Sequence, residues 1–159
     1  MTRLVSWLAA RSVAAQCALL AAVLGLCYLP ALAGGFVWDD TNNLVQNDRL
    51  RSWQSLIEVF LHPAMWSANL PTGTVATYRP LALATMVVDQ KLFGTHPFGY
   101  HLSSILIHIL AQGTCFLLLR RLLGRPVLAF ALAVLGGLHP AAAEAVAWIN
   151  GRSEPLCLA

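Results

Sequence analysis

Two long apolar stretches, Val13–Ala33 and Tyr100–Leu119, constrain this chain more than any other feature of its sequence. About 20 consecutive apolar residues cross the hydrocarbon core of a bilayer as a helix, so both stretches are predicted to span a membrane. A third apolar segment, Val127–Leu138, is short before His139 and continues towards Trp148. The end of a third spanning helix therefore stays open.

The composition supports the same class of protein. Only 11% of the residues are charged, whereas a soluble domain carries about 25%. This deficit predicts an all-α integral membrane protein in contact with the lipid bilayer. The net charge of +3 is small and the basic residues are dispersed, which argues against nucleic acid as a partner. The four cysteines lack metal-ligand spacing, and we expect no disulfide framework.

Arginines beside the apolar stretches predict the orientation. Two precede the first stretch and three lie between the second and the third: Arg3, Arg11, Arg120, Arg121 and Arg125. The positive-inside rule places all five on the cytoplasmic side. The amino terminus is then cytoplasmic and residues 34–99 are external. The alanine-rich composition suggests a bacterial inner membrane, with this loop in the periplasm.

Residues 1–33 are predicted to form the first transmembrane helix or a signal anchor. Ala31-Leu32-Ala33 also matches a signal-peptide cleavage site. The apolar core is longer than a typical signal core, which favours a retained anchor. Either alternative leaves Gly34 and the following residues outside.

The external loop, residues 34–99, is too long for a simple connector and should be folded. Two interfacial helices are predicted in it, Leu50–His62 with Ser52 as its cap and Pro80–Lys91. A turn is expected at Pro71–Thr74. Residues 100–159 hold the second and third spanning helices and the start of a further one, an incomplete domain that suggests a fragment.

An acidic pair, Asp39–Asp40, lies just past the end of the first apolar stretch. Adjacent carboxylates raise one another's pKa, so they need solvent, a cation or a shared proton. The pair fits a polar turn that ends a helix. It also fits chemistry at the membrane surface on a substrate with a lipid tail.

A polar stripe lies along the second apolar stretch: His101, Ser104, His108 and Gln112. At 100° per residue these side chains share one helix face. Polar side chains at membrane depth usually face a bundle interior, so both helix contacts and substrate binding stay open. Metal binding by the two histidines is less favoured, because no third ligand has the matching spacing.

Further polar residues follow the third apolar segment: His139, Glu144 and Arg152. The predicted topology places them on the same outer side as the acidic pair. The planar guanidinium of Arg152 suits a phosphate. The alternative for Arg152 is an ion pair with Glu144 or Glu154.

A longer ordered set of motifs resembles one family. It comprises Trp38-Asp39-Asp40, Asn47, Tyr78-Arg79-Pro80, Phe93-Gly94, Gly99-Tyr100-His101, His108, His139-Pro140, Glu144-Ala145-Val146-Ala147-Trp148 and Gly151-Arg152. This set, from Phe36 to Glu154, resembles the amino-terminal part of the transmembrane-and-tetratricopeptide-repeat proteins, which are membrane glycosyltransferases of the GT-C fold.

The resemblance implies a GT-C-like helical bundle fragment with about three spanning helices. It implies transfer of a sugar, mannose in the animal members, from a polyprenyl-phosphate carrier to a protein or glycan hydroxyl on the non-cytoplasmic side. It makes Asp39 and Asp40 the catalytic acids, with Asp39 favoured as the base. The other family-motif positions are candidates for substrate or lipid-phosphate binding: Arg79, His101, His139, Glu144 and Arg152.

Two questions stay open from the sequence. A divalent metal ion is possible at the acidic pair, because carboxylates serve as bases or as ligands. The alternative function is a polytopic membrane protein without catalysis, such as an assembly or transporter fragment.

Overall fold

The computed structural model describes residues 3–62 and 78–159, and every regular element in those two ranges is a helix or helical turn. In chain order they are α1 (Arg3–Ala9), α2 (Val13–Tyr28), η1 (Leu29–Ala33), η2 (Thr41–Val45), η3 (Asp48–Leu50), α3 (Ser55–Leu61), α4 (Pro80–Phe93), α5 (Pro97–Leu123), α6 (Pro126–Gly137), α7 (Pro140–Ala147), η5 (Ile149–Arg152) and α8 (Ser153–Leu158). The prediction of an all-α chain is confirmed for these residues.

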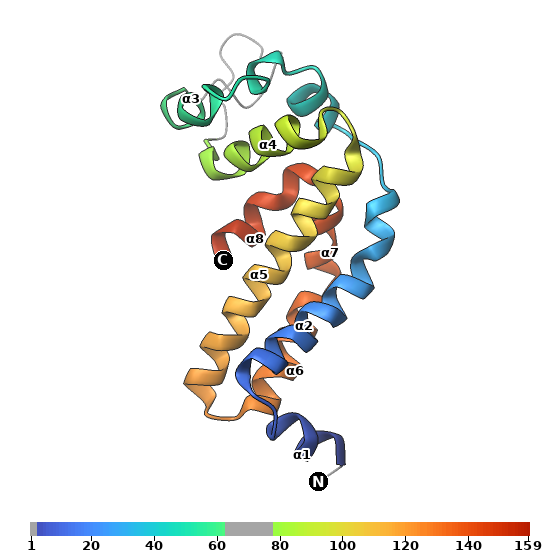
Figure 1. The fold of residues 1–159 in the computed structure, drawn as a ribbon, viewed down its shortest axis with the longest axis vertical. Coiled ribbons are helices and arrows are strands. Elements are labelled where there is room, and N and C mark those ends of the chain that lie inside the picture. Colours follow the sequence, from blue (N-terminus) through green and yellow to red (C-terminus); the bar gives the residue numbers. More distant parts are fainter. Residues whose placement is uncertain (1–2, 63–77) are drawn as a thin grey trace.

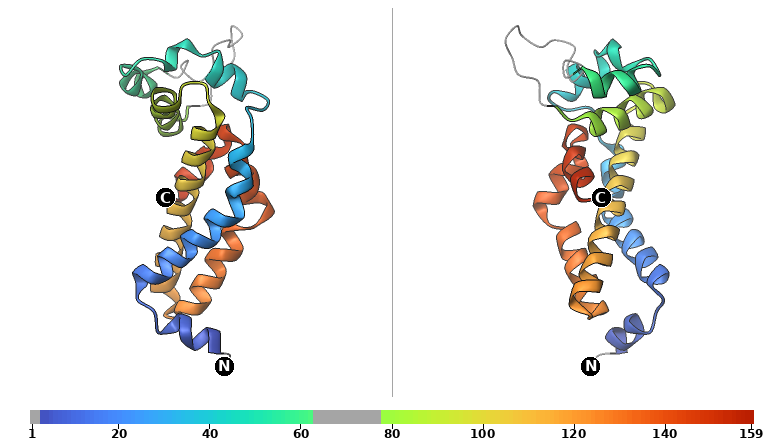
Figure 2. Two further views of the ribbon diagram at one scale, coloured as in Figure 1. Left: turned by 45° about the vertical axis from the view of Figure 1, so that its right-hand side comes forward. Right: turned by 90° about the vertical axis from the view of Figure 1, so that its left-hand side faces the viewer.

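The helices form an elongated bundle with a cap at one end. α2, α5 and α6 run along the long axis, whereas α3 and α4 lie at the end opposite the N-terminus (Figure 1). Two further views keep this arrangement (Figure 2). The segment between the first two long helices therefore folds back over one end of the bundle.

Among the described residues, two helical segments are long and apolar enough to cross a membrane, Val13–Ala33 with 21 residues and Pro97–Leu123 with 27. The first has the predicted bounds. The second extends the predicted Tyr100–Leu119 at both ends, because Pro97 occupies its first position and Gly124, at φ 62°, closes its last turn onto the Arg120 carbonyl. These two helices agree with the prediction of a membrane protein.

The third apolar segment is broken rather than straight. α6 and α7 are bent by 59° relative to each other, so they form one broken span or a re-entrant pair. His139 has an extended backbone and its Nδ1 accepts a hydrogen bond from Ala141 N–H, which caps α7. Pro140 follows and cannot donate a backbone hydrogen bond to continue the preceding helix. The apolar segment therefore continues past His139 as a second, bent helix that begins at Pro140.

Small residues let the long helices approach each other. A Cβ added at Gly137 would lie 2.8 Å from Leu24 Cδ2 and 3.1 Å from Gln112 Cγ. The Gly137 carbonyl accepts a hydrogen bond from the Tyr28 hydroxyl at 2.8 Å and lies 3.0 Å from His108 Nε2. The polar stripe of α5 thus makes helix contacts here, at the end of α6.

The cap is held by its own hydrophobic core: Leu44, Leu50, Val59, Leu83, Met86, Val87, Tyr100 and Ile149. These side chains come from the segment between α2 and α5, from the first turn of α5 and from η5. Such mixed packing fixes this segment on the bundle.

The predicted interfacial helices differ in accuracy. The second one agrees with α4, which ends two residues beyond Lys91. The first was predicted to begin at Leu50, whereas α3 begins at Ser55. Ser52 is not its cap, because Ser52 Oγ accepts a hydrogen bond from the Gln54 N–H, before the helix begins. The turn predicted at Pro71–Thr74 lies outside the described residues.

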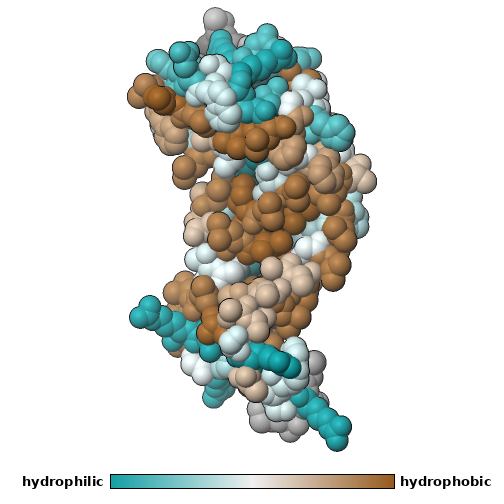
Figure 3. Space-filling view, in the orientation of Figure 1, coloured by the Kyte–Doolittle hydropathy of each residue, from teal (hydrophilic) through white to brown (hydrophobic). Residues whose placement is uncertain are grey.

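The visible surface is divided into bands. A hydrophobic middle separates two hydrophilic ends in the space-filling view (Figure 3). This banding matches a protein whose middle contacts hydrocarbon and whose ends contact water.

Candidate active site

Asp40 lies at the centre of the candidate site, and its side chain is 0% exposed. It follows η1 and accepts two backbone hydrogen bonds, from Val37 N–H to Oδ2 at 3.1 Å and from Asn150 N–H to Oδ1 at 3.3 Å. The second bond joins segments 110 residues apart. Asp40 therefore connects the start of the segment between α2 and α5 to η5.

The surroundings of Asp40 change its acidity. Burial raises its pKa to about 6, and the neighbouring Asp39 carboxylate adds to the rise. The N–H groups of Val37 and Asn150 and the Arg152 guanidinium lower the pKa, but by less than burial raises it. This carboxyl can therefore hold or release a proton close to neutral pH.

Asp39 has the opposite environment. Its side chain is partly exposed, and Oδ2 accepts one hydrogen bond from Asn43 Nδ2 at 3.4 Å. The two adjacent acids are thus distinct, with Asp40 enclosed and Asp39 reachable by a molecule outside the fold. A chemical difference of this kind is what an acid pair with divided roles requires.

Backbone strain occurs next to the acidic pair. Trp38 has φ 51°, a conformation that side-chain-bearing residues rarely adopt, and such strain costs about 1–3 kcal/mol. Its indole is 78% exposed and packs edge-on against Trp148, with ring centroids 5.8 Å apart. With this backbone conformation the Trp38 side chain is exposed, whereas the Asp40 side chain is buried.

Arg152 lies fully buried beneath this turn. Its Nη1 donates to Asp89 Oδ2 at 2.5 Å, and its Nη2 donates to the Tyr100 carbonyl at 2.8 Å. Thr85 and Ser104 accept further hydrogen bonds from the two Nη atoms. The alternative for Arg152, an ion pair with an acidic side chain, is found, but its partner is Asp89 and not Glu144 or Glu154.

The Asp89–Arg152 pair connects three elements, α4, α5 and η5. Asp89 Oδ1 also accepts a hydrogen bond from the Ser103 hydroxyl at 2.6 Å. Burial raises the pKa of Asp89, while Arg152 and Ser103 oppose that rise. The pair holds η5 in place. Because the Asn150 N–H of η5 donates to Asp40, Arg152 stabilises the position of the acidic pair indirectly.

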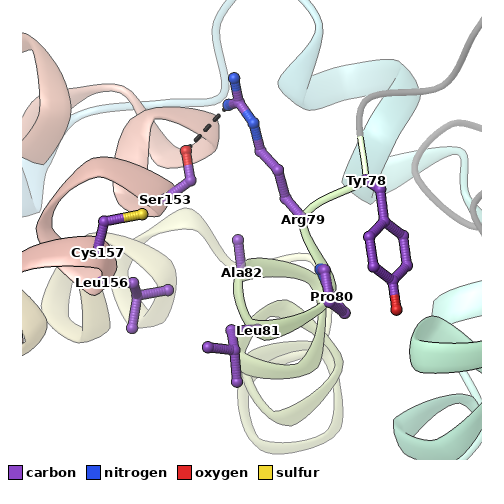
Figure 4. A pocket seen from close by; sticks show the side chains of 8 residues that line it. All are labelled: Tyr78, Arg79, Pro80, Leu81, Ala82, Ser153, Leu156 and Cys157. Carbon is purple, nitrogen blue, oxygen red and sulfur yellow. Dashed lines mark hydrogen bonds between the residues drawn. The ribbon is translucent and has the colours of Figure 1, made fainter.

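Arg79 stands apart, at the mouth of a pocket between α4 and α8 (Figure 4). The pocket has a volume of about 250 Å³, and its apolar lining includes Leu81 and Leu156. The exposed Arg79 side chain extends to Ser153, whose hydroxyl accepts from Nη1 at 2.9 Å. A cation beside apolar side chains can bind an anion that carries a hydrocarbon chain.

The remaining predicted residues are divided between core and surface. His101 is buried against Gly34, where an added Cβ would lie 2.9 Å from Nε2. His139 and Glu144 are exposed on α7 and at its cap. The structure thus gathers Asp40, His101 and Arg152 in the interior and leaves the α7 pair outside.

Two contributors were missed from the sequence, Asp89 and Asn150. A charged residue at the end of the apolar run Leu81–Val88 is the signal that could have identified Asp89. Asn150 acts through its backbone N–H, which its residue type does not reveal. Within residues 3–62 and 78–159, no three His, Cys, Asp or Glu side chains are grouped to hold a metal ion.

Comparison with known proteins found relatives of one kind. The chain is 35% identical over 151 residues to human protein O-mannosyl-transferase TMTC1, across 91% of this chain and 17% of that protein. It is 31% identical over 140 residues to Drosophila melanogaster protein O-mannosyl-transferase Tmtc1, across 88% of this chain and 16% of that protein. Human protein O-mannosyl-transferase TMTC4 is 30% identical over 150 residues, across 83% of this chain and 20% of that protein.

This chain therefore spans no more than 20% of the length of those three relatives. No family model and no solved structure matches it.

Proposed function

Because this chain is homologous over most of its length to segments of the TMTC protein O-mannosyl-transferases, we propose that it carries the acidic pair of a membrane glycosyltransferase. The donor is a polyprenyl-phosphate-linked sugar, mannose, and the acceptor is a hydroxyl of a protein or glycan. The reaction takes place on the non-cytoplasmic side, in a GT-C-like bundle. The observation that carries this proposal is the pairing of an accessible Asp39 with an enclosed Asp40 at the end of the first apolar helix.

Asp39 is the proposed general base. The acceptor oxygen attacks the anomeric carbon, its proton passes to Asp39, and the bond from that carbon to the lipid phosphate breaks with its electrons leaving on the phosphate. A hydroxyl is a poor nucleophile near neutral pH, so a carboxylate within hydrogen-bond reach is needed. The partial exposure of Asp39 supports this role, since an acceptor can approach it.

Asp40 is proposed to orient the loop and to set the charge beside the base. Its two hydrogen bonds come from the Val37 N–H, two residues before Asp39, and from the Asn150 N–H of η5, so they fix the loop on the bundle. A carboxyl with a pKa near 6 can stay partly protonated, which limits repulsion between the two acids. Arg152 acts indirectly, because it holds η5 in place, and it is buried away from substrate.

Arg79 is the proposed ligand of the lipid phosphate. Charge on the leaving phosphate needs a cation, and arginine binds phosphate oxygens in pairs. The adjoining apolar pocket supports this assignment, because a prenyl chain could occupy it. His101, His139 and Glu144 stay candidate positions for the sugar and the acceptor.

The test compares Asp39→Asn and Asp40→Asn in the longest protein that the coding sequence specifies. Transfer of labelled mannose from a polyprenyl-phosphate donor is measured. Loss of a general base lowers kcat by about 10²–10⁴-fold, which we expect for Asp39→Asn. Asp48→Asn is the matched control, because Asp48 lies on the same external segment and is exposed.

Asp48→Asn should keep kcat within about twofold, since surface substitutions rarely matter. Wild-type turnover by both acid variants and by their double variant would reject the base assignment. A protein without transfer activity in any form would instead favour the non-catalytic alternative.

A further inference from the structure

A groove lies at the opposite end of the molecule from the acidic pair, between α1 and the start of α6. Its volume is about 620 Å³, and its lining is Ala9, Gly124, Arg125, Pro126, Val127, Leu128 and Ala131. Arg125 is the charged residue among them and is exposed. The groove therefore combines one cation with a floor of aliphatic side chains.

The surroundings of the groove are strongly basic. Five of the ten basic residues of the chain lie in the two segments at this end, residues 3–11 and 120–125: Arg3, Arg11, Arg120, Arg121 and Arg125. No Asp or Glu occurs before Asp39 or between Asp89 and Glu144. The local field is therefore positive, without an acidic side chain to neutralise it.

Some of these arginines already have partners within the fold. Arg120 Nη1 donates to the buried Gln16 side chain, and Arg11 stacks over the Trp7 ring at 4.3 Å. Arg121 and Arg125 are exposed. Trp7 is half-exposed on α1, where an indole is typical of a membrane–water interface. The groove therefore lies near a residue type that favours the level of lipid headgroups.

We propose that this groove binds one anionic phospholipid, with the phosphate at Arg125 and an acyl chain along Leu128 and Ala131. Charge complementarity selects an anionic headgroup, because basic pockets beside membrane helices bind such headgroups. The aliphatic floor selects an anion that carries a hydrocarbon chain over a free one. The site does not depend on the proposed transferase activity, since it lies at the other end of the bundle.

The test measures lipid binding to the purified full chain in a neutral detergent by native mass spectrometry. Phosphatidylglycerol is titrated, phosphatidylcholine is the neutral lipid, and inorganic phosphate is added as a competitor in a separate arm. One arginine near anionic lipid contributes about 1 kcal/mol, or about fivefold in affinity. We expect Arg125→Gln to weaken phosphatidylglycerol binding by about that factor and to leave phosphatidylcholine binding unchanged.

Two further variants separate the groove from general charge. Ala131→Trp fills the groove without changing the charge, and it should also weaken phosphatidylglycerol binding. Arg51→Gln removes one charge from the external segment, and it should have no effect. Equal binding of the two lipids, an equal loss with Arg51→Gln, or displacement of the lipid by inorganic phosphate at similar concentration would overturn the proposal.

Discussion

Asp40 is the residue whose protonation should most affect stability. Its pKa in the folded protein is about 6, above the ordinary value of 3.8, because it is buried. The folded state then binds the proton more tightly than the unfolded chain does. This stabilisation is complete below pH 3.8 and is lost as the pH rises through about 6.

Asp40→Asn removes this titration. The unfolding midpoint of the variant, measured relative to the wild type in detergent, should therefore rise between about pH 4 and pH 7. A shift from 3.8 to about 6 corresponds to at most about 3 kcal/mol. The hydrogen bond lost in Asp40→Asn lowers stability by the same amount at every pH. A difference in unfolding midpoint that does not change with pH would therefore contradict the raised pKa of Asp40.

The Asp89–Arg152 pair should behave as a buried ion pair. Replacing one partner leaves the other charge buried and uncompensated, which costs about 3–5 kcal/mol. We expect Asp89→Leu and Arg152→Met each to lower the unfolding midpoint strongly. The double variant should lose less than the sum, as a double-mutant cycle of unfolding free energies would show. Additive losses would mean that the two side chains act independently.

At the scale of elements, the α4–α5 turn depends on a close approach. A Cβ added at Gly99 would lie 2.6 Å from Phe93 Cβ and closer still to its ring. Gly99→Ala should therefore displace Phe93 and lower the thermal unfolding midpoint. Gly113→Ala is the matched control on the same helix, because nothing lies within 4 Å of an added Cβ there. It should be neutral or stabilising by up to about 1 kcal/mol, and an equal loss in both variants would contradict the packing argument.

The elements that the sequence predicted best are those with a local cause. Val13–Ala33 is apolar apart from Gln16, and Pro80 and Pro97 mark helix starts by their fixed φ. The π-helical turn Thr41–Val45 has no apolar periodicity to announce it. The break before Pro140 was indicated by the short segment before His139, but the apolar residues on both sides of it left the end of the third span open.

The candidate site was predictable in part. Asp40 and Arg152 were identified by residue type and position, but their burial and their partners depend on packing between distant segments. Asp89 lies 63 residues from Arg152, and no local pattern joins them. The different exposure of Asp39 and Asp40 likewise goes with the strained turn at Trp38, which sequence periodicity does not encode.

At the scale of the whole molecule, the hydrophobic middle and the hydrophilic ends define a membrane axis (Figure 3). The five arginines near the N-terminal end predict that this end is cytoplasmic. The turn between α4 and α5 should then lie on the other side from the turn between α5 and α6, because α5 joins them through the bundle.

Cysteine labelling tests this orientation in intact cells. The four native cysteines are replaced by alanine, and Thr95→Cys or Leu123→Cys is added at either end of α5, which leaves every arginine in place. A membrane-impermeant maleimide should label Thr95→Cys directly and Leu123→Cys only after permeabilisation. At 1.5 Å per residue, a helix of 27 residues is about 40 Å long, enough to cross the hydrocarbon core. Labelling of both positions without permeabilisation would therefore mean that α5 does not span the membrane. The reverse pattern would keep the span but place the acidic pair on the cytoplasmic side, against the proposed site of transfer.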